Sequence, residues 1–176
     1  MSAVTREQIA RMTPQIDLSA QDLGGLDLSR INLPLANLSG SNLNRANLSK
    51  AVLTRANLAG ANLSEASLSG AYLGGANLSG TDLGGANLSG VNLSTAILSG
   101  ADLTDANLTG TNLGGADLSE VKLGGARYNR ETRWPEGFNP AHAGAIKDEP
   151  SQPASGKTTR RTTKPRSTSP RSTSSK

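Results

Sequence analysis

The sequence contains no cysteine, one histidine and four aromatic residues among its 176 positions. Without cysteine there is no disulfide framework and no thiolate zinc site. The single histidine, His142, has no partner motif for nucleophile and base, so we expect no catalytic residue, cofactor or metal. No apolar run approaches the roughly 18 residues needed to span a membrane, and the N-terminus lacks a signal-peptide pattern. These absences predict a cytoplasmic protein that is not an enzyme.

The chain is instead dominated by a five-residue repeat. From Ile16 to Gly125, leucine stands at Leu18 and at every fifth position up to Leu123, 22 times without an exception. Two residues before each leucine the chain mostly has alanine, and one residue before it Asn or Asp. Ser, Thr or Gly mostly fill the two positions after it, so the consensus is A-N/D-L-S-G.

A period of five fits neither a regular helix nor a regular strand. In a helix, residues five apart are separated by about 500° around the axis, and in a strand they face opposite sides. We therefore predict a chain that turns a corner every five residues. The leucines point inward, the Asn and Asp side chains point outward to bond backbone or water, and the coils stack through backbone hydrogen bonds.

The corner two residues after each leucine is mostly glycine, which accepts the positive φ of many turns. Other corners are charged, among them Arg30, Arg45, Lys50, Arg55, Glu65 and Asp105. At these corners we expect either a turn with negative φ or a strained one. Residues 56–121 contain six acids and no base, so charge is predicted to change along the stack. This polarity would orient a charged partner or would simply be a solvated surface.

The run A-N-L-S-G, at Ala76–Gly80 and Ala86–Gly90, resembles the pentapeptide repeat family, and the repeats cover 110 of 176 residues. The resemblance implies a right-handed quadrilateral β-helix with four repeats per coil, a number that the period alone does not choose over three. We therefore predict an all-β solenoid in four segments. These are a capping segment (1–15), the repeat β-helix (16–127), an aromatic C-terminal cap (128–149) and a basic disordered tail (150–176).

The N-terminal segment has the pattern of a short helix that covers the first coil. Thr5 and Gln8 have the spacing of a capping box, and Val4 with Ile9 that of a hydrophobic staple. Pro14 would end this helix. Because a stack of repeats needs a cap at each end, we favour capping over the alternative of a partner-binding helix.

The opposite end of the stack is predicted to be closed by aromatic side chains. Tyr128, Trp134 and Phe138 are three of the four aromatic residues and fall within eleven positions. Aromatic rings are large enough to cover the leucines of the last coil. This segment also resembles one that closes such repeat domains in bacterial proteins. A ligand-binding aromatic cluster is the alternative.

From Pro150 onward the sequence holds seven Lys or Arg residues and no acid. Residues 1–149 contain 11 basic and 14 acidic residues, a net charge of −3, so the tail makes the whole chain +4. A segment without apolar residues is expected to be disordered and dispensable for folding. Cations neutralise phosphates without reading sequence, which predicts weak nucleic-acid contacts at Lys157, Arg160, Arg161, Lys164, Arg166 and Arg171. A solubilising or membrane-grazing extension is the alternative.

One outward column departs from the Asn/Asp pattern. With four repeats per coil, residues twenty apart lie above each other, which places Val52 directly below Tyr72 between Asn32 and Asn92. Leu35 and Arg55 follow on the adjacent corner, whereas Ile97 falls on another side. We interpret Leu35, Val52, Arg55 and Tyr72 as a candidate protein contact, because an exposed apolar patch beside basic residues is typical of one. Chance drift of the repeat is the alternative.

These features predict a scaffold or interaction module that presents flat faces to an unidentified protein partner. The resemblance offers a second hypothesis, because some pentapeptide repeat proteins mimic duplex DNA, bind DNA gyrase and protect it from inhibitors. A short rod with a basic first half fits that role less well. Nucleic-acid binding through the tail is the third. The sequence does not predict the oligomeric state.

Overall fold

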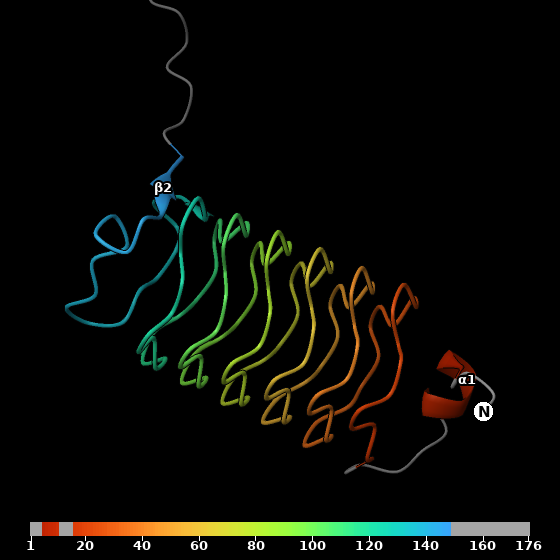
Figure 1. Cartoon of the computed structure of the whole chain (residues 1–176). Coiled ribbons are helices and arrows are strands. Elements are labelled where there is room, and N and C mark those ends of the chain that lie inside the picture. Colours follow the sequence, from red (N-terminus) through yellow and green to blue (C-terminus); the bar gives the residue numbers. More distant parts are fainter. Residues whose placement is uncertain (1–4, 11–15, 149–176) are drawn as a thin grey trace, which may run out of the picture.

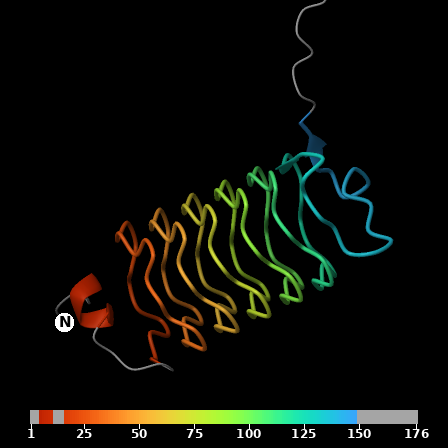
Figure 2. The same ribbon diagram turned by 180° about the vertical axis from the view of Figure 1, so that it is seen from behind.

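The computed structural model describes residues 5–10 and 16–148. They form a rod of stacked coils, with the short helix α1 (Arg6–Ala10) near one end and a loop region at the other (Figures 1 and 2). In that region, β1 (Arg127–Tyr128) pairs in parallel with β2 (Ile146–Lys147). Predictions that concern residues 1–4, 11–15 and 149–176, including the staple at Val4, the helix stop at Pro14 and the basic tail, lie outside the described residues.

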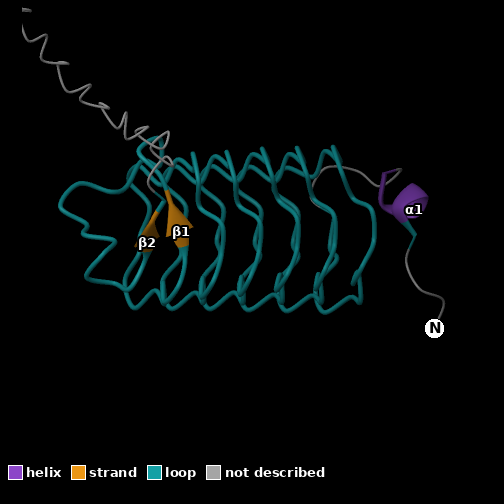
Figure 3. Cartoon of the chain, turned by 90° about the horizontal axis from the view of Figure 1, so that it is seen from above, coloured by secondary structure: helices purple, strands orange, loops and turns teal. Residues whose placement is uncertain are grey.

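Each coil of the rod has four sides. Parallel backbone bridges join residues twenty apart, beginning with Asp17 and Asn37, and the coils follow one another along a single axis (Figure 3). The outward residues form four columns: side 1, Asp17, Asn37, Asn57, Asn77, Ile97 and Asp117; side 2, Asp22, Asn42, Asn62, Asp82, Asp102 and Lys122; side 3, Asp27, Asn47, Ser67, Asn87, Asn107 and Arg127; side 4, Asn32, Val52, Tyr72, Asn92, Asn112 and Arg133.

The bridges confirm four repeats per coil and the predicted column through Val52 and Tyr72. Over residues 16–126 the pairing consists of isolated bridges rather than continuous strands. The reason is the repeat length, because a turn follows each paired residue before a second pair can form. The solenoid is therefore held by a ladder of single bridges on every side.

Hydrogen bonding explains the composition of the repeat, as the five residues around Leu78 illustrate. Their five N–H groups donate as follows: Ala76 to the Leu73 carbonyl (3.0 Å), Asn77 to that of Ala56 (2.9 Å), Leu78 to that of Ile97 (2.7 Å), Gly80 to that of Ser99 (2.9 Å), and Ser79 to Asn77 Oδ1 (3.1 Å). The Asn side chain supplies the one acceptor that the backbone ladder lacks. An Asp at this position does the same.

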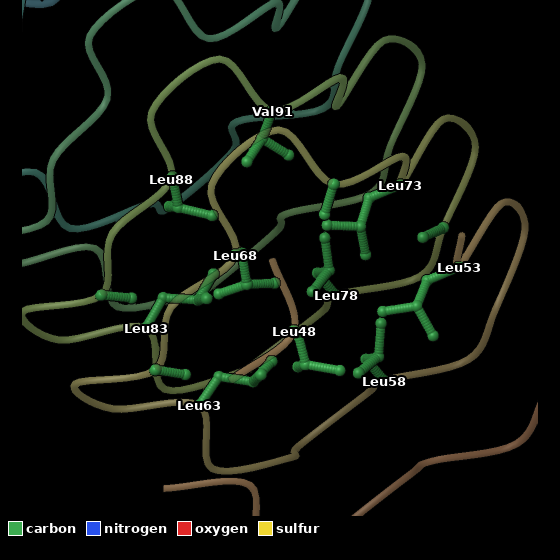
Figure 4. Packing of buried hydrophobic residues seen from close by; sticks show 14 of the residues in the cluster. Leu48, Leu53, Leu58, Leu63, Leu68, Leu73, Leu78, Leu83, Leu88 and Val91 are labelled. Atoms are coloured by element: carbon green, nitrogen blue, oxygen red, sulfur yellow. The ribbon is translucent and has the colours of Figure 1, made fainter. Parts of the chain in front are cut away.

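The core is a column of leucines that fills the axis of the rod, and the close-up in Figure 4 shows several of them directed inward. From Leu18 to Leu123, none of the 22 is more than 8% exposed. Burying one leucine is worth about 1.5–3 kcal/mol, so this column stabilises a domain with few aromatic residues. Where Thr81 replaces the inward alanine, its buried hydroxyl donates to the Leu58 carbonyl at 2.8 Å.

The corner residues adopt the left-handed conformation whether or not they are glycine. The φ angles are 57° at Arg30, 58° at Arg45 and 59° at both Lys50 and Arg55, and Glu65 and Asp105 follow the same pattern. The expectation of a negative φ at these corners is wrong, and the strained alternative applies. The cause is the ladder, in which the N–H of each of these six corner residues donates to a carbonyl of the next coil and thereby fixes one geometry. Each such residue costs about 1–2 kcal/mol relative to a relaxed backbone.

The coil continues beyond the predicted boundary at residue 127, with aromatic residues in leucine positions. Arg133 donates its N–H to the Thr111 carbonyl at 2.9 Å and accepts from Leu113 at 2.7 Å, as outward residues do in the regular repeats. Trp134 therefore stands where a leucine would, as Tyr128 does after Arg127. One additional residue lies between them, so Asn112 pairs with Arg133, 21 residues on. The aromatic segment therefore keeps the register of the repeats, and the division at residue 127 stays a prediction.

The three aromatic rings of this segment pack on one another. Trp134 meets Tyr128 edge-to-face at 5.5 Å and stacks on Phe138 at 5.3 Å between ring centroids. All three are partly buried against the leucine core. This arrangement has the form expected of a cover for the last coil, and its capping role remains a prediction.

Helix α1 has the predicted N-terminal capping box. The Thr5 N–H donates to Gln8 Oε1 at 2.8 Å, and the Gln8 N–H donates to Thr5 Oγ1 at 3.3 Å. Ile9 is fully buried, and the Arg6 guanidinium donates to the Ser29 carbonyl at 2.8 Å. The helix thus contacts the first coils, and the prediction that it closes the stack is left to mutagenesis of Ile9.

Candidate functional site

The structure brings together the four residues predicted as a protein contact. Val52 and Tyr72 are bridged on side 4, and Leu35 and Arg55 occupy successive corners on the edge between sides 4 and 1. Tyr72 is 53% exposed and Leu35 is 45% exposed. We call Leu35, Val52, Arg55 and Tyr72 the side 4 patch. By contrast, Ile97 lies alone on side 1 between Asn77 and Asp117, as predicted.

The side 4 patch interrupts the side-chain hydrogen bonding of the repeat. Val52 and Tyr72 have no oxygen at the position of Asn Oδ1, and the N–H groups of Thr54 and Gly74 have no protein partner among the described residues. One coil earlier, Pro34 has no N–H to donate. Three consecutive coils of side 4 therefore lack a bond that recurs on the other sides with only single interruptions. In the sequence, the missing hydrogen bonds are visible as the replacement of Asn or Asp by Val52 and Tyr72 in one column.

The edges beside side 4 carry cations without ion-pair partners. Within residues 5–10 and 16–148 the ion pairs are Arg6–Asp27, Arg45–Glu65, Lys122–Asp102 and Arg127–Asp148. Arg30 and Lys50, on the edge between sides 3 and 4, and Arg55, on the edge between sides 4 and 1, take part in none of them. No acid occurs at 30–35, 50–55, 70–75, 90–95 or 110–115. Side 4 is thus cationic and apolar along the first coils.

The opposite side of the rod is acidic. A shallow depression of about 400 Å³ on side 2 and its edge is lined by Glu65, Asp82, Asp102 and Asp105. Arg45 lies 2.8 Å from the Glu65 carboxylate, and Lys122 lies 3.3 Å from that of Asp102, so two of these four carboxylates are already paired. The predicted change of charge along the stack is therefore accompanied by a change across it, from side 4 to side 2.

Hydrogen bonds lower the pKa of several outward carboxyl groups. The pKa values of Asp17 and Asp117 lie below the ordinary value of 3.8, chiefly because Ser19 and Ser119 donate to the carboxylate through side chain and backbone. The pKa of Glu65 is lowered by the hydrogen bond and charge of Arg45. In each case the folded state favours the ionised form.

We expect acid to destabilise the rod through these carboxylates. A pKa that is lowered in the folded state contributes stability above the unfolded value, near 3.8 for Asp, and this contribution is lost as the pH falls through the folded value. The double variant Asp17→Asn/Asp117→Asn keeps one acceptor oxygen at each of the two positions, so it should melt like the parent at neutral pH. Because it has no carboxylate there to protonate, it should lose less stability than the parent in acid. Thermal melts by circular dichroism across this range test it. Parallel losses in both proteins would contradict the assignment.

The described residues contain neither a metal-ligand cluster nor a membrane-spanning helix. Within them, no group of three or more His, Cys, Asp or Glu side chains is placed to hold a metal ion. His142 is exposed in the C-terminal loop region. No helix in the described part of the chain is long and apolar enough to cross a membrane. The nucleic-acid contacts predicted from Lys157 to Arg171 lie outside the described residues.

The chain matches the family described as "Pentapeptide repeats" in 8 copies, over residues 15–49, 31–70, 46–85 and 86–125. Among solved structures it is similar to trypsin-treated QnrB1, a plasmid-mediated fluoroquinolone resistance protein, at 23% identity and a TM-score of 0.56. That match covers 75% of this chain and 60% of the QnrB1 chain. It is also similar to alr5209, a pentapeptide repeat protein from Nostoc, at 33% identity over 81% of this chain and 93% of that one, with a TM-score of 0.37. No curated protein matches the sequence.

Proposed function

The chain belongs to the pentapeptide repeat family, whose members fold as right-handed quadrilateral β-helices. From this premise we propose that it is a non-enzymatic interaction module that presents side 4 to a protein partner. The observation that carries the proposal is the side 4 patch. There, exposed Tyr72 lies one coil above Val52, and on this side both coils lack the side-chain hydrogen bond that Asn or Asp accepts elsewhere in the repeat. An exposed apolar cluster with an aromatic and an arginine is typical of a protein-binding surface.

The construction of the rod favours binding over catalysis. Leucine fills the axis on every side, so reacting groups have no enclosed cavity in the repeat region from which water is excluded. What the repeat offers is a flat side with outward side chains at a fixed spacing of about 4.8 Å along the axis. Such a surface recognises a partner by the order of its side chains.

We expect Tyr72→Asn to weaken partner binding without loss of stability. The new amide supplies the missing acceptor for the Gly74 N–H, so the melting temperature should be unchanged or slightly higher. Ile97→Asn is the matched control, because Ile97 is 44% exposed on side 1. Affinity capture with the full chain and sedimentation of each variant are the measurements. If Tyr72→Asn captures and sediments like the parent and the control, side 4 is not the binding surface.

A second candidate function, recognition of DNA gyrase by a DNA-like acidic face, is supported by the carboxylates on side 2. The pairing of Glu65 with Arg45 and of Asp102 with Lys122 weakens that support, because it reduces the free negative charge. A supercoiling assay with purified gyrase and the full chain tests this candidate function. A change in gyrase activity that disappears in Asp82→Asn/Asp105→Asn would favour gyrase recognition by side 2 over partner binding by side 4.

Nucleic-acid binding by residues 150–176 and a cytoplasmic location are also proposed, on composition alone. Seven cations and no acid in this segment support phosphate binding that weakens with salt. A shift of DNA mobility by the full chain that disappears in a chain ending at Glu149 is the expected result. Retention of the shift in the shortened chain would assign it to the rod.

A further inference from the structure

We propose that side 4 binds an acidic peptide segment in which carboxylates flank an apolar side chain. This inference rests on the proposed function, because it names the chemical class of the partner for the same surface. Three features of side 4 carry it: the direction of two cationic side chains, two backbone donors without partners, and the apolar pair between them.

Two cations are directed at the repeat of Tyr72 from its two edges. A Cβ added at Gly75 would lie 3.4 Å from Arg55 Cγ, and one added at Gly70 would lie 3.6 Å from Lys50 Cγ. The stems of both side chains therefore run along the rod axis, across the glycine corners that precede and follow Tyr72. Both stems thus lie at van der Waals distance from the position that a Cβ would take at these glycine corners.

Between these stems, the backbone presents donors rather than acceptors. The N–H groups of Thr54 and Gly74 stack one coil apart and have no partner among the described residues. Elsewhere a carboxylate or amide oxygen of the chain itself accepts this bond. A carboxylate from a partner is the natural replacement, since it accepts from backbone N–H groups and pairs with Arg55.

The apolar pair and the overall charge favour a peptide over a nucleic acid. Val52 and the exposed ring of Tyr72 form an anchor for an aliphatic or aromatic side chain, which a phosphate backbone does not have. Residues 1–149 carry a net charge of −3, and the acidic depression lies on the opposite side. This field of the rod disfavours a long polyanion along side 4, whereas a short acidic segment meets only the local cations.

The probe for this proposal is a fluorescein-labelled peptide in which glutamates alternate with Phe and Leu, titrated with the full chain by fluorescence anisotropy. Lys50→Gly/Arg55→Gly removes both cations and places glycine at two corners with positive φ, so folding is retained. Arg45→Gly makes the same type of change on another edge and is the control. All variants keep the basic tail, whose contribution to binding is therefore common to all.

We expect the double variant to weaken peptide binding by about tenfold or more, and Tyr72→Asn to weaken it as well, with Arg45→Gly within about twofold of the parent. Equal losses in the double variant and the control would overturn the proposal, as would equal binding of a peptide with Gln in place of Glu. A larger effect of Lys50→Gly/Arg55→Gly on an oligothymidine probe would assign the surface to nucleic acid instead. Tyr72→Asn could instead abolish capture of a cellular partner while it binds the acidic peptide as tightly as the parent. In that case the proposed function stands, and the proposal that the partner is an acidic peptide fails.

Discussion

Leu78→Asp is expected to unfold the rod. Leu78 is 1% exposed and lies in the middle of the stack, within the buried hydrophobic cluster of the leucine column (Figure 4). A carboxylate there would be buried without a partner, at a cost of several kcal/mol. Because each coil of a solenoid contacts only its neighbours, the loss of one central layer separates the coils on either side of it.

Asn77→Asp is the control for this change, one residue away and pointing outward. Asn77 Oδ1 accepts from the Ser79 N–H at 3.1 Å and from the Ser79 hydroxyl at 2.8 Å, and an aspartate oxygen accepts both bonds equally well. Thermal melts followed by circular dichroism should show a cooperative transition for Asn77→Asp and none for Leu78→Asp. Equal melting of the two variants would mean that leucine does not face the axis.

The regular part of the fold follows from the sequence because each of the five positions of the repeat has the same surroundings in every coil. Every leucine meets the same axis, and most outward Asn and Asp residues accept from the N–H group two residues on. The pattern predicts that leucine points inward and that Asn and Asp point outward. The four-sided coil came from the family resemblance, and it is what converts a spacing of twenty into columns. Once that number is accepted, Val52 under Tyr72 follows without coordinates.

The irregular parts required the structure. The φ angles at Arg30 and Lys50 are imposed by the ladder between coils, which local turn preferences do not describe. The register of Tyr128 and Trp134 does not follow from the sequence pattern, because one additional residue lies between them and because leucine fills the inward position in all the preceding repeats. Their common signal is an arginine before each aromatic, at Arg127 and Arg133.

The sequence predicts where the proposed binding surface lies, but not the direction of its cationic side chains. The sequence places Leu35, Val52, Arg55 and Tyr72 near one another, but it does not show that the Arg55 and Lys50 stems lie along the axis. Nor does it show which cations are already paired. Arg45 and Arg55 occupy the same position in the repeat, but of these two only Arg45 forms an ion pair within the described residues.

Trp134→Ala is expected to destabilise the C-terminal coil by about 3 kcal/mol, the usual cost of removing a large aromatic side chain from a packed cluster. The loss includes the edge-to-face contact with Tyr128 and the stacking on Phe138. If the three aromatics were instead a ligand site, this variant would melt like the parent, and chemical denaturation distinguishes the two outcomes.

Trp134→Phe separates the packing of the ring from its polar atom. The Trp134 Nε1 is buried and has no hydrogen-bond partner among the described residues, so the indole N–H is a cost of about 1–3 kcal/mol rather than a gain. Phenylalanine keeps a ring in the inward position between Tyr128 and Phe138 and removes that N–H. We therefore expect Trp134→Phe to be as stable as the parent or more stable, while Trp134→Ala is clearly weaker. A phenylalanine variant as unstable as the alanine variant would show that the N–H has a function, and Trp134 would then not be the equivalent of a leucine.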